Sequence, residues 1–350
     1  MKKTIAVLPG DGIGPEITAQ SVRFLKKVAK QFGHEFTFKE GLIGAVAIDK
    51  TGDSYPKETH ELSLKADAIL LGAIGDPKYD NDPTAKVRPE QGILGIRKAL
   101  GLYANIRPIE IFPSIADKSP LKAEIIKDVN FVVIRELIGG IYFGKRGRTK
   151  NGTAAFDTSE YSKDEIVRIA KYAFEVTRSR HSERSRGISS HQAAQLKRSL
   201  DYARDDTSKV GWDDGSKGKL TVVDKANVLE TSRLWRETVQ AMEKDYPDIA
   251  VDYMFVDNAA MQIIKRPSVF DVLLTENMFG DILTDEASVI TGSIGLLPSA
   301  SIGVKNALYE PIHGSFPKAA GQNYANPIGS MLSAAMLLEY SFGLKKERDA

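Results

Sequence analysis

The segment Ile5-Ala6-Val7-Leu8-Pro9-Gly10-Asp11-Gly12-Ile13-Gly14-Pro15-Glu16 sets the pattern of the whole chain. Ile5 to Leu8 is a short apolar run typical of a buried strand, the glycines favour a turn, and Pro15 suits the first turn of a helix. We expect that helix to run to about Phe32. Short apolar runs alternate with helix-period segments through the rest of the sequence, which predicts an α/β fold.

The same two signals predict the remaining elements. Strands are expected at 36–39, 68–71, 131–134, 220–223, 250–256 and 269–274. Helices are expected at 92–100, 164–177, 228–244, 278–290 and 330–342. Apolar residues recur at helical spacing within these helices, so each should bury one stripe against the sheet.

The glycines at 10, 12 and 14 stand where a dinucleotide-binding fingerprint would lie. That fingerprint needs a further glycine, and Pro15-Glu16 follow instead. The spacing therefore argues against a Rossmann fold. A tight turn that requires positive φ explains these glycines at least as well.

The composition excludes several classes of protein. The 350 residues contain no cysteine, which rules out disulfides, zinc–thiolate sites, iron–sulfur clusters and thiol nucleophiles. With 48 basic and 46 acidic residues, the net charge of +2 gives no general attraction to nucleic acid or to an anionic membrane. Neither a signal-peptide pattern nor a membrane-length apolar run is found, so we expect a cytoplasmic protein of two domains or one large α/β unit.

Residues 179–218 are rich in Ser, Arg and Asp and contain few large aliphatic residues. Such a segment cannot bury enough apolar surface to offset a backbone ordering cost of about 1–2 kcal/mol per residue. We interpret it as an exposed, disordered insertion between a helix and a strand, with one short helix near 191–204. Its arginines leave binding to RNA or to a partner protein open as an alternative.

Asp281 and Asp285 give the strongest local signal, within Asn277-Met278-Phe279-Gly280-Asp281-Ile282-Leu283-Thr284-Asp285. Residues four apart on a helix lie on one face, with Cβ atoms ~5–6 Å apart. Two like charges so close favour a divalent cation, and carboxylate oxygens suit Mg²⁺. The alternative is that both acids interact only with the helix dipole.

Arg97, Arg107 and Arg135 each lie near the end of a predicted element. Guanidinium groups bind carboxylates with two parallel hydrogen bonds, so three that converge would bind a di- or tricarboxylate. Lys225 follows a predicted strand and is a candidate base, and Tyr142, in a glycine-rich turn, is a candidate proton donor. Ordinary surface or core roles stay open for each. Two Gly/Pro-rich loops, 310–315 and 325–327, are candidates to bind an adenine or phosphates.

Taken in order, these motifs resemble those of the isocitrate/isopropylmalate family of β-decarboxylating dehydrogenases. The resemblance runs from 8–16 through 135–142, resumes at 223–229 and continues to 342–344. It implies two α/β domains around a shared twisted sheet. Residues 1–102 and 292–350 would form the cofactor-side domain, and residues 103–291 the domain for dimerisation, substrate and metal. An arm at about 135–160 would complete a homodimer with shared active sites.

The resemblance also implies roles for single residues. Arg97, Arg107 and Arg135 would bind the malate carboxylates. Asp281 and Asp285, with Asp257 of the partner subunit, would bind Mg²⁺ or Mn²⁺. Lys225, also from the partner, would be the base or base relay at the C2 hydroxyl, and Tyr142 would protonate the enol after CO₂ leaves.

The residues before Arg97 resemble the isopropylmalate pattern. Ile93, Leu94 and Val228 of the partner subunit would face an isopropyl group, with Glu90 in the same segment. Isocitrate-specific members carry Ser and Asn there, because an apolar wall against a carboxylate is costly. The implied reaction converts the small molecule 3-isopropylmalate to 4-methyl-2-oxopentanoate, as in leucine biosynthesis. Isocitrate, tartrate or another alkylmalate is the alternative substrate.

NAD is the implied cofactor, with contacts from Asn277, Glu310, His313, Gly314, Ser315, Lys318 and Asn326. Lys318 departs from the family pattern, because NAD-selective members commonly carry an Asp that accepts hydrogen bonds from both ribose hydroxyls. A lysine would favour a 2′-phosphate, yet the Tyr that usually accompanies it in NADP-dependent members is Ala319 here. We therefore keep NAD as the expected cofactor.

A second hypothesis, that the protein is not an active enzyme, rests on two departures from the family pattern. The sequence ends at Ala350, where the family continues into another helix, and the insertion lies just upstream of Lys225. Either departure would be compatible with a folded remnant whose catalysis is impaired.

Overall fold

The computed structural model describes residues 1–82, 84–187 and 217–350. Ten strands form one sheet in the order β2-β1-β3-β12-β11-β4-β5-β10-β8-β9, and β6 and β7 form a separate hairpin. The strands are β1 (Lys2–Gly10), β2 (Glu35–Glu40), β3 (Ala68–Ala73), β4 (Ala104–Glu110), β5 (Asn130–Glu136), β6 (Arg146–Thr149), β7 (Ala154–Asp157), β8 (Gly218–Asp224), β9 (Ile249–Phe255), β10 (Val272–Thr275), β11 (Pro298–Ile302) and β12 (Ala307–Pro311).

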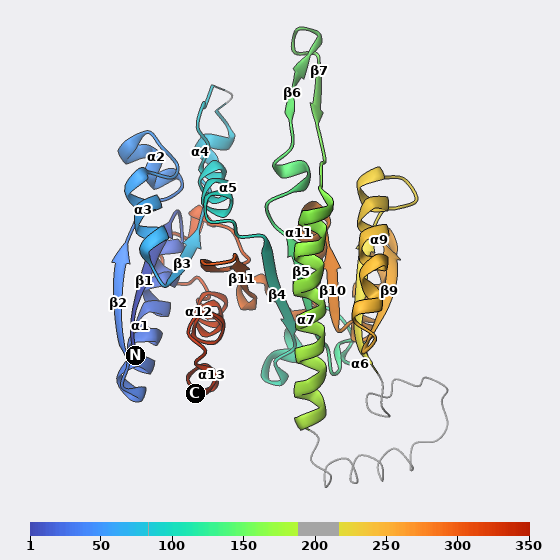
Figure 1. Ribbon diagram of the computed structural model, residues 1–350. Coiled ribbons are helices and arrows are strands. Elements are labelled where there is room, and N and C mark those ends of the chain that lie inside the picture. Colours follow the sequence, from blue (N-terminus) through green and yellow to red (C-terminus); the bar gives the residue numbers. More distant parts are fainter. Residues whose placement is uncertain (83, 188–216) are drawn as a thin grey trace.

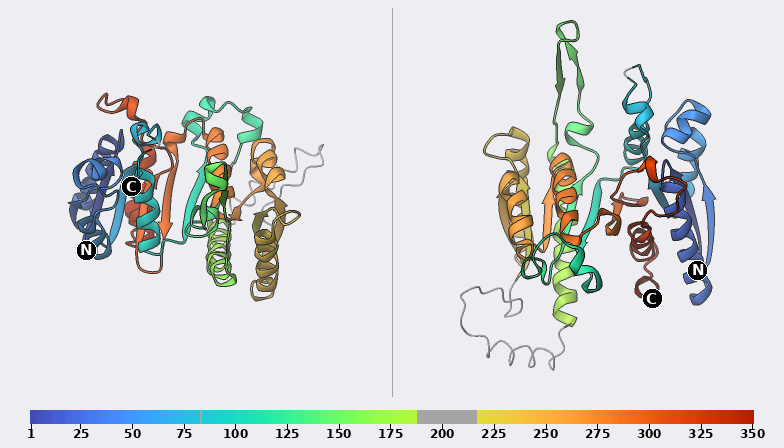
Figure 2. Two further views of the ribbon diagram at one scale, coloured as in Figure 1. Left: turned by 90° about the horizontal axis from the view of Figure 1, so that it is seen from above. Right: turned by 180° about the vertical axis from the view of Figure 1, so that it is seen from behind.

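Helices lie on both faces of this sheet (Figures 1 and 2). They are α1 (Gly14–Phe32), α2 (Ala45–Thr51), α3 (Lys57–Lys65), α4 (Pro77–Asp80), α5 (Pro89–Ala99), α6 (Ala123–Ile126), α7 (Lys163–Gly187), α9 (Glu230–Met242), α10 (Val256–Lys265), α11 (Asn277–Ser288), α12 (Ile328–Tyr340) and α13 (Lys345–Asp349). No helix in the described ranges is long and apolar enough to cross a membrane.

The sheet has two parallel parts joined by antiparallel strands. β2, β1, β3 and β12 are parallel, as are β5, β10, β8 and β9, whereas β11 and β4 pair antiparallel to their neighbours. The two chain ends lie together in one half, and the middle of the chain forms the other (Figure 1). The predicted α/β fold with a shared sheet, distinct from a Rossmann fold, is confirmed.

The two faces of the sheet bury their apolar side chains differently. On one face a single core crosses all ten strands, and α1, α12, α7 and α9 cover it. On the opposite face there are two cores: α5 covers one, centred on Leu8 and Leu71, and α10 and α11 cover the other, centred on Val133 and Leu273. We call this second face the divided face.

The turn between β1 and α1 confirms the structural interpretation of its glycines. Gly10 and Gly12 have φ of 71° and 57°, which only glycine adopts without strain. The buried Asp11 carboxylate accepts N–H hydrogen bonds from Ala45 and Val46, at the start of α2, and from Gly75. The turn thus fixes α2 against β1 instead of forming a dinucleotide fingerprint.

Several predicted boundaries need correction. α7 continues to Gly187 rather than ending near 177, so the first part of the 179–218 segment is helical. Residues 188–216, including the helix expected near 191–204, lie outside the described residues. α9 begins at Glu230 rather than 228, and β10 begins at Val272 because a 3₁₀ turn occupies Pro267–Val269. The 310–315 segment is not all loop, since its first two residues end β12.

Candidate active site

Three buried arginines meet on the divided face. Arg97 lies on α5, Arg107 on β4 and Arg135 at the end of β5. Ile106 and Ile134 belong to the single core on the opposite face, which we call the continuous core. Side chains alternate between the two faces along a strand, so the neighbouring Arg107 and Arg135 lie on the divided face. All three predicted arginines are therefore buried, and their order in space follows from the pairing of β4 with β5.

The acids of α11 lie against these arginines. Arg135 donates to Asp281 at 2.5 Å, and Arg107 lies 3.6 Å from Asp281 and 3.7 Å from Asp285. One guanidinium thus reaches both carboxylates, so they project from one helix face as predicted. Arg107 also donates to Thr284 at 2.5 Å and, through Nε, to Asn105 at 2.7 Å.

Tyr142 completes the inner group. Its hydroxyl donates to the second oxygen of Asp281 at 2.8 Å, and the Arg135 guanidinium lies 5.7 Å from its ring centre. Burial raises the pKa of the Tyr142 phenol, and the Asp281 charge raises it further. The phenol is therefore protonated at neutral pH, as a proton donor must be.

The charges of this group change one another's pKa values. Burial lowers the pKa of Arg135 to about 9, and the charge of Arg107 adds to that effect. Burial acts to raise the pKa of Asp281, but Arg135 and Arg107 outweigh it and hold that pKa below its ordinary value. Asp285 behaves differently, because burial raises its pKa despite Arg107. Asp281 is thus a fully paired carboxylate, whereas Asp285 is one that would gain from a further cation.

A divalent cation fits these donors only in part. Asp281 and Asp285 are hard oxygen ligands on successive turns of one helix. Within the described ranges, however, no group of three or more carboxylates or histidines could hold a metal together. The described part of the chain therefore brings two carboxylates together at this point.

Lys225 and Asp257 form a second, separate group. Lys225, just past β8, donates to Asp257 at the start of α10 at 2.5 Å. The hydrogen bond from Lys225 lowers the pKa of Asp257. The Asp257 side chain is 62% exposed, and Val228, three residues past Lys225, is also exposed. The structure does not bring these three predicted residues to Asp281 within one chain.

The residues expected at the cofactor have varied surroundings. Glu310 accepts from Arg97 at 2.8 Å, and Asn326 receives the N–H of Ile328 at the start of α12. Ser315 is buried, and its carbonyl accepts the N–H of Ile13. Lys318 is exposed, as is Gly314, whereas the pKa of His313 is lowered by burial.

Asn277 was expected at the cofactor but is only 1% exposed. Its side-chain oxygen accepts from Nε and Nη2 of Arg135, and its amide donates to the Gly139 carbonyl. In this structure it positions Arg135, and a cofactor contact stays a prediction. Its partners lie more than a hundred positions away in the sequence, so no local signal could have revealed this role.

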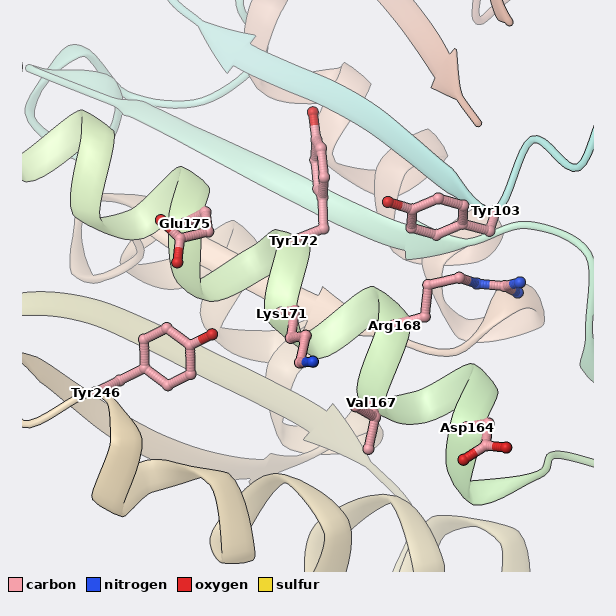
Figure 3. Close-up of a pocket in the computed structure, with 8 residues that line it drawn as sticks. All are labelled: Tyr103, Asp164, Val167, Arg168, Lys171, Tyr172, Glu175 and Tyr246. Carbon is pink, nitrogen blue, oxygen red and sulfur yellow. The ribbon is translucent and has the colours of Figure 1, made fainter. Parts of the chain in front are cut away.

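The segment expected to face the substrate side chain lies at the start of α5. Ile93 and Leu94 are half-buried one turn before Arg97, and Glu90 is exposed. A cavity of about 480 Å³ lies elsewhere, along α7 between Tyr103 and Tyr246, and shares no lining residue with the arginine group (Figure 3). The arginine group is therefore distinct from this cavity.

Comparison with known protein families agrees with this arrangement. Residues 4–211 and 209–350 match the isocitrate/isopropylmalate dehydrogenase family, so the chain belongs to that family. The family predicted from the sequence motifs is thereby confirmed.

Individual relatives narrow the comparison. A 3-isopropylmalate dehydrogenase of Bacteroides fragilis (strain YCH46) is 50% identical over 343 residues, which cover 98% of this chain and 86% of the relative. One from Aquifex aeolicus is 49% identical over 353 residues, with 100% and 87% coverage. Among solved structures, an isocitrate dehydrogenase from Methylococcus capsulatus superposes with a TM-score of 0.79 at 30% identity, covering 99% of this chain and 88% of that one.

Proposed function

We propose that this chain catalyses the NAD⁺-dependent oxidation and decarboxylation of 3-isopropylmalate to 4-methyl-2-oxopentanoate. The observation that carries the proposal is the meeting of three buried arginines with the acid pair of α11 and Tyr142. The relatives named 3-isopropylmalate dehydrogenase, at about half identity over nearly the whole chain, support this substrate.

The charges of the site suit a dianionic substrate. Three arginines face three carboxylates, those of Asp281, Asp285 and Glu310. A bound divalent cation leaves two positive charges in excess, which two substrate carboxylates balance. Arg97 also keeps one buried N–H, its Nε, without a hydrogen-bond partner in the described part of the chain.

Asp281 and Asp285 would hold Mg²⁺ or Mn²⁺, together with Asp257 of the partner subunit. When bound there, such an ion supplies Lewis-acid stabilisation of the negative charge that develops on the substrate oxygen. Arg97, Arg107 and Arg135 orient the two carboxylates of the substrate. The half-buried position of Ile93 and Leu94 supports an apolar contact to the isopropyl group.

Proton transfers fall to Lys225 and Tyr142. Lys225 of the partner subunit would be the base, or the relay to a base, that takes the proton of the C2 hydroxyl, and NAD⁺ when bound would supply the hydride acceptor. Loss of CO₂ then leaves an enol, and Tyr142 donates a proton to its carbon. The raised pKa of the Tyr142 phenol supports this role, because the group carries its proton at neutral pH.

A homodimer would unite the two groups of residues. α10 and α11 pack together, and Met261 on α10, Ile282 on α11 and Val289 just past α11 are exposed. Val228, three residues past Lys225, is exposed as well. The β6–β7 hairpin extends beyond the rest of the chain (Figure 1), as expected of a dimer arm. A second copy covering these residues would bring its Lys225 and Asp257 to Asp281.

A panel of two cofactors and two substrates tests the proposal. Purified protein with Mg²⁺ should reduce NAD⁺ with 3-isopropylmalate and should turn over isocitrate at least tenfold less efficiently. Preference for isocitrate would move the activity within the family, and no turnover at all would favour an impaired remnant. NADP⁺ in place of NAD⁺ tests Lys318, and Lys318→Asp should shift any NADP⁺ preference back toward NAD⁺.

A further inference from the structure

We propose that Glu136 is a positioning residue for Tyr142, because its buried carboxylate fixes the Gly139–Gly140 turn that brings the tyrosine to Asp281. The inference rests on the proposed function, in which Tyr142 is the proton donor. Glu136 touches neither the arginines nor the acids of the site, and nothing in its local sequence marks it beyond its place beside Arg135.

Arg135 and Glu136 are adjacent at the end of β5, and their side chains point to opposite faces of the sheet. Arg135 points to the divided face, and Glu136 points to the continuous core, where it is fully buried. Both of its carboxylate oxygens accept backbone hydrogen bonds, from the N–H of Ile138 at 3.1 Å and from the N–H of Gly139 at 2.8 Å. A buried carboxylate persists only with such donors, so the turn and the acid stabilise each other.

The turn has little freedom to move. Gly140 has φ of 70°, and a Cβ added at Gly139 would lie 2.6 Å from Cε1 of Tyr161. The Tyr161 hydroxyl accepts the N–H of Asn277 at 3.0 Å, and the Gly139 carbonyl accepts from the Asn277 side chain at 3.1 Å. The turn therefore packs between Glu136, Tyr161 and the first residue of α11.

The position of Tyr142 depends on this turn. It stands two residues past Gly140, in the 3₁₀ turn Gly140–Tyr142, and its hydroxyl reaches Asp281 at 2.8 Å. If the turn shifts, the phenol leaves Asp281, while Arg107 keeps its own bonds to Asn105 and Thr284. Glu136 should thus act on the proton transfer more than on substrate binding.

An amide cannot replace this carboxylate. Two N–H groups face its two oxygens, and a glutamine would offer one oxygen and one NH₂ group, which leaves a donor facing a donor. Burial raises the pKa of Glu136 to about 7, and the two backbone donors oppose that rise. Glu165 and Arg168 of α7 are the further charges that act on it, one raising and one lowering the pKa.

Glu136→Gln is the test, made in wild-type and in Tyr142→Phe backgrounds. In wild type we expect kcat for 3-isopropylmalate to fall about tenfold or more and KM to change less than twofold. In the Tyr142→Phe background the same change should have no further effect on kcat. Amide hydrogen exchange at Ile138 and Gly139 should become faster, with the rest of the core unchanged. Glu175→Gln is the matched control, because it changes an exposed acid of α7 that pairs with Arg178 and should leave kcat and exchange at Gly139 unchanged.

Three results would overturn the proposal: an unchanged kcat, an equal loss of kcat in both backgrounds, or unchanged exchange at Gly139. If Glu136→Gln does not fold, Glu136→Asp keeps the charge and shortens the reach, and the same three criteria apply to it. Hydrogen exchange needs no substrate. Faster exchange without any turnover in the parent protein would contradict the proposed function and leave the positioning contact supported.

Discussion

Arg135 lies at the end of β5 and Lys225 just past β8, two parallel strands of one sheet, and yet their surroundings differ sharply. Arg135 is 2% exposed and bonds to Asn277 and Asp281, which in turn bond to Gly139 and Tyr142. Lys225 is 26% exposed, and its ammonium donates to the exposed Asp257. The arginine group forms within one chain, whereas the Lys225–Asp257 pair lies at the surface.

The two groups differ in how much their contacts contribute to stability. Residues that bind charge are buried together, because each desolvated charge needs its partner close by. The residue that would move a proton is placed where its pair contributes little to stability, since exposed ion pairs stabilise by about 0.2–1 kcal/mol. Substitutions in the arginine group should therefore cost much stability, whereas substitution of Lys225 should cost activity with little change in stability.

Lys225→Met should have the largest effect, and only on activity. Loss of a general base lowers kcat by about 10²–10⁴-fold. The free energy of unfolding should change by less than about 1 kcal/mol, because only the exposed pair with Asp257 is lost. Steady-state kinetics and urea denaturation measure the two quantities. Lys219→Met on β8, which loses the pair with Asp252 of β9, is the control and should leave kcat unchanged.

Arg135→Met should reverse that pattern for stability. Asp281 and Asn277 lose their shared cation in a buried site, which costs about 3–5 kcal/mol of unfolding free energy. Arg178→Met removes an exposed pair with Asp248 and should cost less than about 1 kcal/mol. A loss at Arg135 as small as that at Arg178, measured by urea denaturation, would contradict the contrast drawn between the two groups.

Mg²⁺ should stabilise the folded protein through Asp285. At a hundred times its dissociation constant, a ligand that binds only the folded state adds about 2.7 kcal/mol. Calorimetry should show a higher Tm with Mg²⁺ and no such rise in Asp285→Asn. Glu286→Gln, one residue further along the helix, is the control. A rise that persists in Asp285→Asn would place the metal elsewhere.

Glu276→Gln should change the pH dependence of stability by the smallest amount. Burial raises the pKa of Glu276 to about 7, with Glu136 adding to the rise, so the folded state keeps a proton that the unfolded state loses near its ordinary pKa of 4.5. Stability from this group is therefore lost as pH rises from about 4.5 to 7. Relative to wild type, the variant should gain about 1–3 kcal/mol between pH 5 and pH 8. A constant difference across that range would mean that Glu276 does not titrate there.

Much of this could be predicted from the sequence, for local reasons. The β1 turn, the apolar strands and the Asp281–Asp285 spacing depend on residues close together in the chain. β4 and β11 were missed because their buried positions include Asn105, Arg107, Ser299 and Ser301, which break the apolar runs that reveal a strand.

The meeting of these side chains in space could not be predicted from local sequence patterns. Arg107 meets Arg135 only through the pairing of β4 with β5, and Asn277 reaches Gly139 across the whole middle of the chain. The family resemblance supplied the arginine set, but it said nothing of Asn105, Thr284 or Glu136. Those residues hold others in place, and their partners become visible only in three dimensions.

The undivided face of the sheet has a consequence for how the protein unfolds. Its core draws side chains from every strand of the large sheet, so neither half can bury its apolar surface alone. Cutting the chain at the borders of the middle segment would expose a large apolar area on both pieces, at about 25 cal/mol per Å². The two halves form one cooperative unit, and heat or denaturant should melt them together in a single transition.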